Sequence, residues 1–160
     1  NLALQNDFFD TLMDVIPHTG IGDIRLGSSR ESIATMLGAA EKKSRDYHED
    51  GEHSEVWVYR LLRLELSFDS EHDFYLSHIT SYHPYTLVRS FNPIGLEEKF
   101  LLQKFPHLDL DVEVSTEEKY FTDKVLDLTF GTARGKVVSV TIFPAYDGDG
   151  KQVLWPAGPS

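Results

Sequence analysis

The sequence predicts an α+β fold in which two tandem repeats, each a helix plus an antiparallel sheet, form one broad curved sheet with helices on one face. Three observations predict it. In each half of the chain, a segment with helical spacing precedes segments of alternating apolar residues. The segment Leu64–Phe68 (LELSF) matches Leu126–Phe130 (LDLTF) position by position. Ile33 matches Leu101 in the same way, so both the helix and the sheet recur.

We therefore expect a single domain over residues 1–160, made of two repeats at about 7–84 and 86–144 and ending in a short C-terminal tail. A chain of this length can bury a sizeable core. The number of residues between matching positions of the two repeats is larger for the helices than for the strands. The connection from helix to sheet is therefore shorter in the second repeat, and loops tolerate such a change. Two ordinary helix-plus-hairpin units of similar length would give the same pattern without duplication, and the sequence leaves this alternative open.

Three segments have the spacing of amphipathic helices. Residues 7–16 carry apolar side chains three and four positions apart, between an aspartate that can cap the helix and a proline that stops it. Residues 28–38 begin with a capping box, from Ser28 to Glu31, and end at a glycine. Residues 95–105 form the third predicted helix, which a proline also stops.

Alternation of apolar and polar residues predicts the strands. Residues 62–68 alternate strictly, and residues 56–59 are aromatic and β-branched, as strands prefer. Residues 41–54 have no hydrophobic period, which predicts a polar loop between the second helix and the sheet. The other predicted strands are 23–26, 74–82, 86–88, 108–116, 125–130 and 137–143.

Charge and composition exclude several classes of function. The chain has 15 Lys and Arg against 26 Asp and Glu, for a net charge of −11. Phosphate repels carboxylates, so we expect no nucleic-acid partner; the acids favour a basic partner or provide solubility. The absence of cysteine excludes disulfides, thiol nucleophiles and thiolate metal sites. No apolar run approaches the roughly 18 residues of a membrane span, and the first residues lack a signal-peptide pattern, which predicts a cytoplasmic location.

Several short motifs resemble those of a known repeat unit. They are Leu26–Glu31 (LGSSRE) after a glycine-bounded short strand, a helix ending at Leu37-Gly38, then Val58-Tyr59 and Leu64–Phe68. The order is similar to that in the β-lactamase inhibitor protein and the BamE-like outer-membrane assembly lipoproteins. The resemblance covers roughly residues 20–143 and implies helical hairpins packed on small antiparallel sheets, with two tandem copies as in the inhibitor. The chain has neither the lipoprotein cysteine nor the inhibitor's paired cysteines.

A second resemblance concerns function. A small acidic protein without cysteine and of this predicted architecture is similar to the immunity proteins that neutralise contact-dependent or polymorphic bacterial toxins. This resemblance implies a protein that binds a basic toxin and has no enzymatic activity of its own. It rests on composition and architecture, because no shared motif carries it.

Motifs for catalysis or cofactor binding are weak. His48 and His53, with carboxylates between them, are five positions apart, which is neither the spacing of a zincin nor that of a zinc finger. They leave a small metal-assisted hydrolase as an alternative function. The segment Asp147–Gly150 lacks the later glutamate of a calcium loop and predicts a turn. With no nucleophile elbow and no glycine-rich phosphate loop, we expect no cofactor, no bound metal and no catalytic residue.

Charge placement gives the candidate binding residues. Acids concentrate in residues 46–73 and 109–127, which the predicted repeats make equivalent, and aromatic residues are interleaved with them. An aromatic anchor inside a charged rim is typical of protein interfaces. The predicted partner-binding residues are Asp46, Tyr47, Glu49, Asp50, Glu52, Trp57, Asp109, Asp111, Glu113 and Tyr120.

These observations predict an acidic binding protein, an immunity or inhibitor protein that occludes the active site of a basic toxin such as a nuclease. Carboxylates would pair with the toxin's Lys and Arg side chains in place of substrate phosphates. We expect a monomer that binds one partner. Besides the hydrolase, an assembly or chaperone-like adaptor that uses a sheet edge or the helix at residues 7–16 is the remaining alternative.

Overall fold

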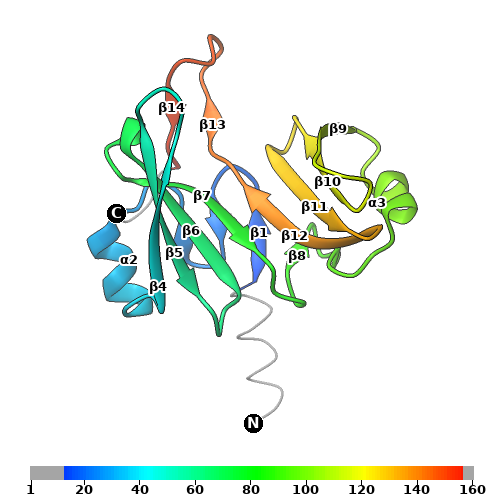
Figure 1. Ribbon diagram of the computed structural model, residues 1–160, viewed down its shortest axis with the longest axis horizontal. Coiled ribbons are helices and arrows are strands. Elements are labelled where there is room, and N and C mark those ends of the chain that lie inside the picture. Colours follow the sequence, from blue (N-terminus) through cyan, green and yellow to red (C-terminus); the bar gives the residue numbers. More distant parts are fainter. Residues whose placement is uncertain (1–12, 157–160) are drawn as a thin grey trace.

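The computed structural model describes residues 13–156. Its main element is an eight-stranded antiparallel sheet in the order β4-β5-β6-β7-β12-β11-β10-β9 (Figure 1). The bounds of these strands are β4 Lys42–Tyr47, β5 His53–Tyr59, β6 Leu64–Asp69, β7 Leu76–Ser81, β9 Leu108–Glu113, β10 Glu118–Asp123, β11 Leu128–Ala133 and β12 Lys136–Ile142.

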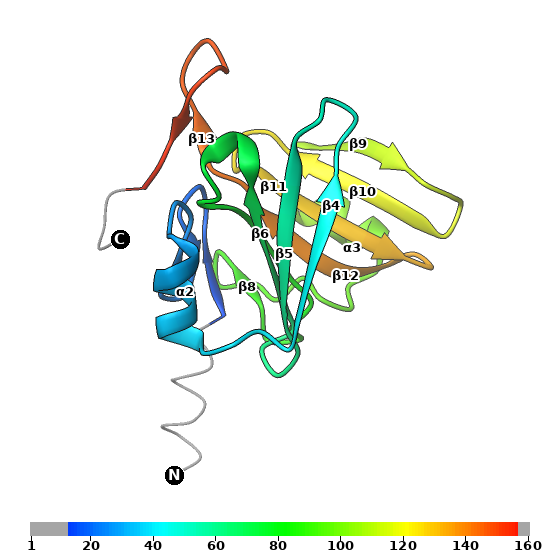
Figure 2. The same cartoon turned by 60° about the vertical axis from the view of Figure 1, so that its left-hand side comes forward.

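The remaining elements are short. A four-stranded sheet has the order β3-β2-β1-β8, in which β1 pairs with β8 in parallel although the two are far apart in sequence. A hairpin of β13 and β14 projects beyond the eight-stranded sheet (Figures 1 and 2). The bounds are β1 Asp14–Ile16, β2 Gly20–Ile21, β3 Ile24–Arg25, α2 Arg30–Leu37, η1 (a 3-10 helix) Ser70–His72, β8 Leu87–Val88, α3 Glu98–Lys104, β13 Ala145–Tyr146 and β14 Val153–Leu154.

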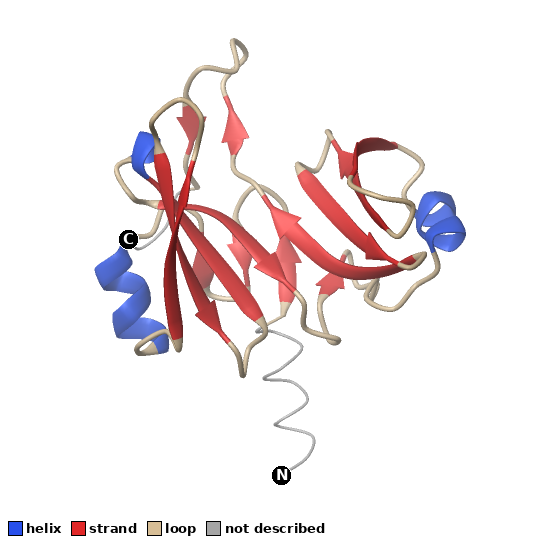
Figure 3. Ribbon diagram, viewed as in Figure 1, coloured by secondary structure: helices blue, strands red, loops and turns tan. Residues whose placement is uncertain are grey.

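The predicted fold class is wrong. The described part of the chain is mainly β, with 47% of its residues in strands and 12% in helices. Two α-helices occur among the described residues, and one large antiparallel sheet dominates (Figure 3). The chain is therefore not a tandem of helix-plus-sheet units with helices on one face. None of the described helices is long and apolar enough to cross a membrane.

Strands missed by the sequence reading account for this difference. Residues 41–54, predicted as a polar loop, form β4, a tight turn and the start of β5, and residues 118–123 form β10. β4 is exposed along its whole length, so its side chains show no burial period. Its place in the sheet comes from backbone pairing with β5, which side-chain polarity does not reveal.

The predicted helix at residues 7–16 is only partly testable. Residues 7–12 lie outside the described part of the chain. Asp14–Ile16 is not helical, because it forms β1 between β2 and β8. The other two predicted helices correspond to α2 and α3, where Ile33 and Leu101 are fully buried. The side-chain cap of α2 comes from Ser29, whose hydroxyl accepts a hydrogen bond from the Ser32 amide.

The two halves of the large sheet share a hydrogen-bond pattern. The Gly27 amide donates to the Leu76 carbonyl at 2.8 Å, and the Gly95 amide donates to the Val137 carbonyl at 2.8 Å. Both glycines have φ near +90°, a conformation that favours glycine. In each half, therefore, the same contact ties the segment before the helix to the last strand of that half.

The register of this correspondence differs from the sequence match. Opposite Ser67 and Phe68 of β6, the strand β7 carries one extra residue, Ser77, which makes a β-bulge. Opposite Gly131 and Thr132 of β11, the strand β12 carries Val138 in the same way. Aligning the bulges places Ser67 on Gly131, so Leu64 corresponds to Leu128 and not to Leu126. The match of LELSF with LDLTF is two residues out of structural register.

Candidate functional site

The eight-stranded sheet has one apolar and one polar face. Leu64, Leu66 and Phe68 of β6 are buried in the core, and the intervening Glu65 and Ser67 therefore point to the opposite face. We call this opposite surface the outer face. The Thr80 and Thr141 hydroxyls hydrogen-bond across β7 and β12 at 2.9 Å, so the outer face continues from one half of the sheet into the other.

A first hollow on the outer face is centred on Asp69 at the end of β6, and we call it the Asp69 hollow. Its volume is about 240 Å³. Residues from β4, the β4–β5 turn, β5, β6 and β7 line it: Asp46, His48, Ser54, Val56, Glu65, Ser67, Asp69, His78 and Thr80.

Hydrogen bonds hold the Asp69 carboxylate in one orientation. The hydroxyls of Ser54 and Ser67 donate to Oδ1 at 2.6 and 3.0 Å. The Asp69 amide donates to the Ser77 hydroxyl at 3.1 Å, which fixes the backbone as well. The other carboxylate oxygen, Oδ2, lies 3.9 Å from Nδ1 of His78. Asp69 is 8% exposed and therefore presents a positioned, nearly buried charge.

His78 is the basic group nearest to Asp69 in this hollow. Burial lowers the pKa of His78 below its ordinary 6.5, although the Asp69 carboxylate raises it in part. The nearby His48 and His72 oppose protonation of His78 as well. His78 is therefore mainly neutral at pH 7 and leaves the charge of Asp69 uncompensated.

The lowered pKa of His78 predicts how stability depends on pH. In the unfolded chain His78 titrates near 6.5, so the unfolded state binds more protons between that value and the lower folded pKa. The free energy of unfolding should therefore fall as pH drops through 6.5 and level off below the folded pKa. Urea unfolding from about pH 7.5 to about pH 5 should show a steeper loss for the wild type than for His78→Gln. His107→Gln, at an exposed position, is the control, and equal slopes for wild type and His78→Gln would contradict this prediction.

The arrangement of serine, histidine and aspartate in this hollow is not that of a catalytic triad. In a triad, the histidine lies between the serine and the carboxylate and takes the serine proton. Here the Ser54 hydroxyl gives its single proton to Asp69, while Nε2 of His48 lies 3.0 Å from the Ser54 oxygen and donates to it. Ser54 is therefore held as a structural hydroxyl, and the set is suited to binding.

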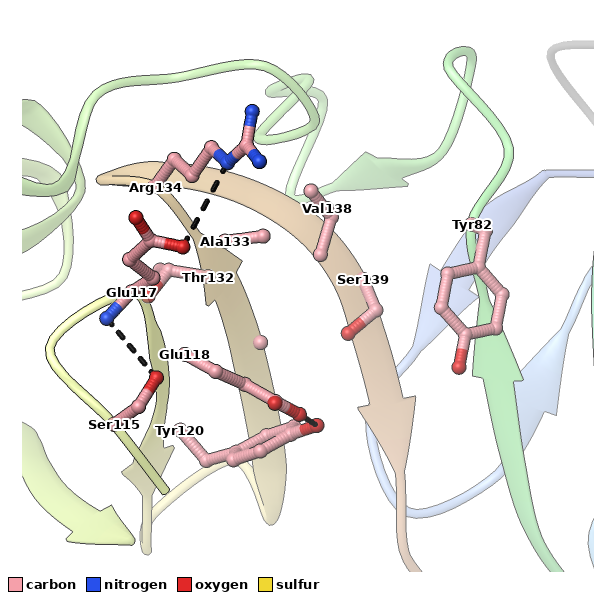
Figure 4. A pocket seen from close by; sticks show the side chains of 11 residues that line it. Tyr82, Ser115, Glu117, Glu118, Tyr120, Thr132, Ala133, Arg134, Val138 and Ser139 are labelled. Carbon is pink, nitrogen blue, oxygen red and sulfur yellow. Dashed lines mark hydrogen bonds and ion pairs between the residues drawn. The ribbon is translucent and has the colours of Figure 1, made fainter. Parts of the chain in front are cut away.

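A second hollow lies on the outer face in the other half of the sheet, and we call it the tyrosine hollow (Figure 4). Its volume is about 390 Å³. The Tyr120 hydroxyl donates to Glu118 at 2.8 Å, and this bond is the main cause that raises the pKa of Tyr120. Burial, with the nearby Glu65 carboxylate, raises the pKa of Tyr82 to about 12. The lining residues are Tyr82, Ser115, Glu117, Glu118, Tyr120, Gly131, Thr132, Ala133, Arg134, Val138 and Ser139.

The two hollows occupy corresponding places in the two halves. The two halves correspond when Ser67 is placed on Gly131 and the neighbouring strands keep the same pairing. Five residues that line one hollow then correspond to residues that line the other. Both hollows therefore form beside the same bulge. The corresponding pairs are Ser54 and Glu118, Val56 and Tyr120, Ser67 and Gly131, Asp69 and Ala133, and His78 and Ser139.

The charge of the two hollows is strongly negative. Five carboxylates line them, and the one Lys or Arg side chain among the lining residues is Arg134. Nε of Arg134 lies 3.8 Å from Glu117, so its charge is compensated locally. Tyr82, 40% exposed, lies near Glu65 and Glu118 between the two hollows. The outer face thus combines uncompensated acids with accessible tyrosines.

The structure distributes the first predicted acidic segment over several surfaces. Asp46 lines the Asp69 hollow. Tyr47 is 71% exposed, and its ring contacts that of His53. Trp57 is 3% exposed and packs against Phe68, so its prediction as a contact residue is wrong. The other three predicted acids of this segment lie in or beside the β4–β5 turn: Glu49, Asp50 and Glu52.

The second predicted segment lies at the opposite edge of the sheet. Asp109, Asp111 and Glu113 are exposed on β9, whereas Asp46 is on β4 at the other edge. Charged side chains on edge strands also discourage pairing with other chains. Tyr120, from the neighbouring strand β10, lines the tyrosine hollow. Of the ten predicted residues, Asp46 and Tyr120 line a hollow of the outer face. Asp111 accepts a hydrogen bond at 3.2 Å from Thr122, whose hydroxyl also contacts that of Thr129.

The alternative metal pair is not assembled. His48 points to Ser54 in the Asp69 hollow, whereas His53 contacts the rings of Tyr47 and Phe74. A different set of donors could hold a metal ion: one atom each from Asp69, Glu71 and His72 lies within 4.8 Å of the others.

Sequence reasoning missed four residues of the outer face, namely Glu65, Asp69, Tyr82 and Glu118. They are far apart in the chain and meet only through strand pairing. A signal was present, because the acidic and hydroxyl residues at 65, 67 and 69 alternate with the apolar residues of β6. Glu65 and Asp69 also belong to the acidic segment 46–73.

Comparisons with known proteins show no family. No family model matches the chain, and no curated protein matches it. Among solved structures, the chain is similar to an extracellular protein containing a SCP domain from Bacillus anthracis str. Ames, with a TM-score of 0.45 and 13% sequence identity. The match covers 84% of this chain and 50% of that chain, so this chain spans about half the length of that protein. A similarity at this level carries no conclusion about function.

Proposed function

We propose that this protein binds a basic protein through the outer face of its eight-stranded sheet. The observation that carries the proposal is the set of five carboxylates around the two hollows, of which one, Glu117, is paired with the single lining arginine. Such a surface attracts cationic partners over long distances and speeds their association. Tyr82 and Tyr120 supply the aromatic contacts that concentrate binding energy in interfaces.

Within this proposal, the protein is an immunity or inhibitor protein for a basic toxin such as a nuclease, and it acts in the cytoplasm. Carboxylates on the outer face take the place of substrate phosphates and pair with the toxin's Lys and Arg side chains. The protein performs no chemistry of its own and blocks access to the toxin's active site. The first partner to test is the product of a neighbouring reading frame with a toxin-like C-terminal end.

Affinity for that partner should depend on salt and on the outer face. We expect the association rate to fall at least tenfold between about 50 and about 300 mM salt, because screening weakens long-range attraction. Tyr82→Ala combined with Glu118→Gln should weaken binding by about tenfold or more. Surface plasmon resonance measures both effects.

Two substitutions away from the hollows provide the control. Tyr85→Ala removes an exposed tyrosine, and Asp149→Asn removes one negative charge in the β13–β14 turn, so together they match the test variant. This control should bind as the wild type does. A salt-independent association rate, or equal losses in the two double variants, would overturn the proposal.

A further inference from the structure

The Asp69 carboxylate has one oxygen that is free to bind a ligand. Oδ1 accepts two hydroxyl hydrogen bonds, whereas Oδ2 has no hydrogen bond within residues 13–156. Its nearest basic group is Nδ1 of His78, at 3.9 Å. In the same part of the chain, every fully enclosed side-chain polar atom has a partner, so Oδ2 is reached from the hollow. A carboxylate oxygen on a residue that is 8% exposed gains strongly from a charged donor.

The surroundings of Oδ2 select a cation. Asp46 and Glu65 add two further carboxylates to the walls of the hollow, and none of the described residues that line it is a Lys or Arg. The hydroxyl of Thr80 offers an additional acceptor at the seam between the two halves. The hollow thus has three carboxylates among its lining residues, with two histidines as its only basic side chains.

The shape of the hollow favours a guanidinium over other cations. A guanidinium carries five N–H donors in one plane and can reach several separated acceptors at once. A volume of about 240 Å³ exceeds what an ammonium group fills. A metal ion would use Asp69 with Glu71 and His72, and the last two do not line the hollow.

We infer that the Asp69 hollow receives an arginine side chain of the basic partner, whose guanidinium donates to Oδ2 of Asp69 and to the carboxylates of Glu65 and Asp46. This inference rests on the proposed function and names the contact by which the partner is recognised. The tyrosine hollow has Ala133 in place of Asp69, so the arginine site belongs to one half of the sheet.

The test uses the full chain, labelled with ¹⁵N, and N-acetyl-arginine methylamide as the probe in an NMR titration. We expect saturable shifts of the amides of Ser54, Ser67, Asp69 and His78. Asp69→Asn should weaken this binding about tenfold or more, since a charge-assisted hydrogen bond is lost. If Asp69→Asn does not fold, Asp46→Asn at the exposed rim should still weaken it about threefold. Asp149→Asn carries the same change in net charge and should have no effect.

Two further titrations separate the possible ligands. N-acetyl-lysine methylamide should bind more weakly than the arginine probe, and equal binding would overturn the assignment of arginine. Mn²⁺ that selectively broadens the signals of Asp69, Glu71 and His72 and displaces the arginine probe would assign the site to a metal. Failure of the arginine probe to shift these amides also overturns the inference.

These outcomes are distinguishable from failure of the proposed function. If the basic partner binds with strong salt dependence and Asp69→Asn binds it as the wild type does, the proposed function stands and the arginine site is wrong. If the arginine probe binds as expected and no basic partner does, the arginine site stands as a ligand site and the proposed function is wrong.

Discussion

Phe130→Ala should lower the free energy of unfolding by about 3–5 kcal/mol. Phe130 lies on β11 and is fully buried, and its ring centroid is 4.9 Å from that of Phe105 at the end of α3. Removing the ring leaves a cavity in the core that joins α3 to the large sheet, and the rigid strands around it cannot close it fully.

Urea unfolding followed by circular dichroism measures this loss. Val138→Ala on the neighbouring strand β12 is the control, because Val138 is 39% exposed and should change stability by less than about 0.5 kcal/mol. A loss below about 1 kcal/mol for Phe130→Ala would mean that Phe130 is not packed in a closed core beneath α3.

Gly20→Ala should cost about 3 kcal/mol or more in stability. A Cβ at this position would lie 1.9 Å from the carbonyl oxygen of Ile24. That oxygen belongs to the backbone of β3, and the hydrogen bond from the Leu26 amide to the Thr19 carbonyl, at 2.8 Å, ties the two strands together beside it. The clash is therefore relieved only by breaking the β2–β3 pairing.

Differential scanning calorimetry measures the effect. For a chain of this length, a loss of that size corresponds to a decrease in Tm of roughly 6–12 °C. Gly148→Ala is the matched control, because a Cβ at Gly148 meets no atom within 4 Å, and its Tm should stay within about 2 °C of the wild type. Equal Tm values for the two variants would show that the clash at Gly20 is absent in solution.

Particular elements show how far the sequence could predict the fold. The caps and apolar spacing of residues 28–38 and 95–105 predicted helices close to α2 and α3. The strictly alternating residues 62–68 predicted β6. β4 could not be predicted in this way, because all its side chains are exposed and its pairing is a property of the backbone. Without β4 and β10, the balance of helix and sheet, and hence the fold class, was wrong.

The candidate site was predictable only in its chemistry. The excess of acids and the interleaved aromatic residues predicted an acidic surface with aromatic contacts, and Asp46 and Tyr120 do line the two hollows. The arrangement depends on strand register, which places Leu64 on Leu128, two residues away from the sequence match. Composition also does not tell which face of a strand a side chain occupies. Trp57 was predicted to contact a partner, and its ring lies in the core beside Phe68.

The parallel pairing of β1 with β8 has a consequence for the kinetics of folding. Asp14 pairs with Leu87, so this contact closes a loop that takes up nearly half of the chain, whereas most neighbours in the large sheet are joined by short turns. Closing a long loop costs more chain entropy than closing a hairpin, and non-local contacts slow folding. We therefore expect the consecutive strands β4–β7 and β9–β12 to assemble first, and the non-local pairs β7–β12 and β1–β8 to form in the slowest steps.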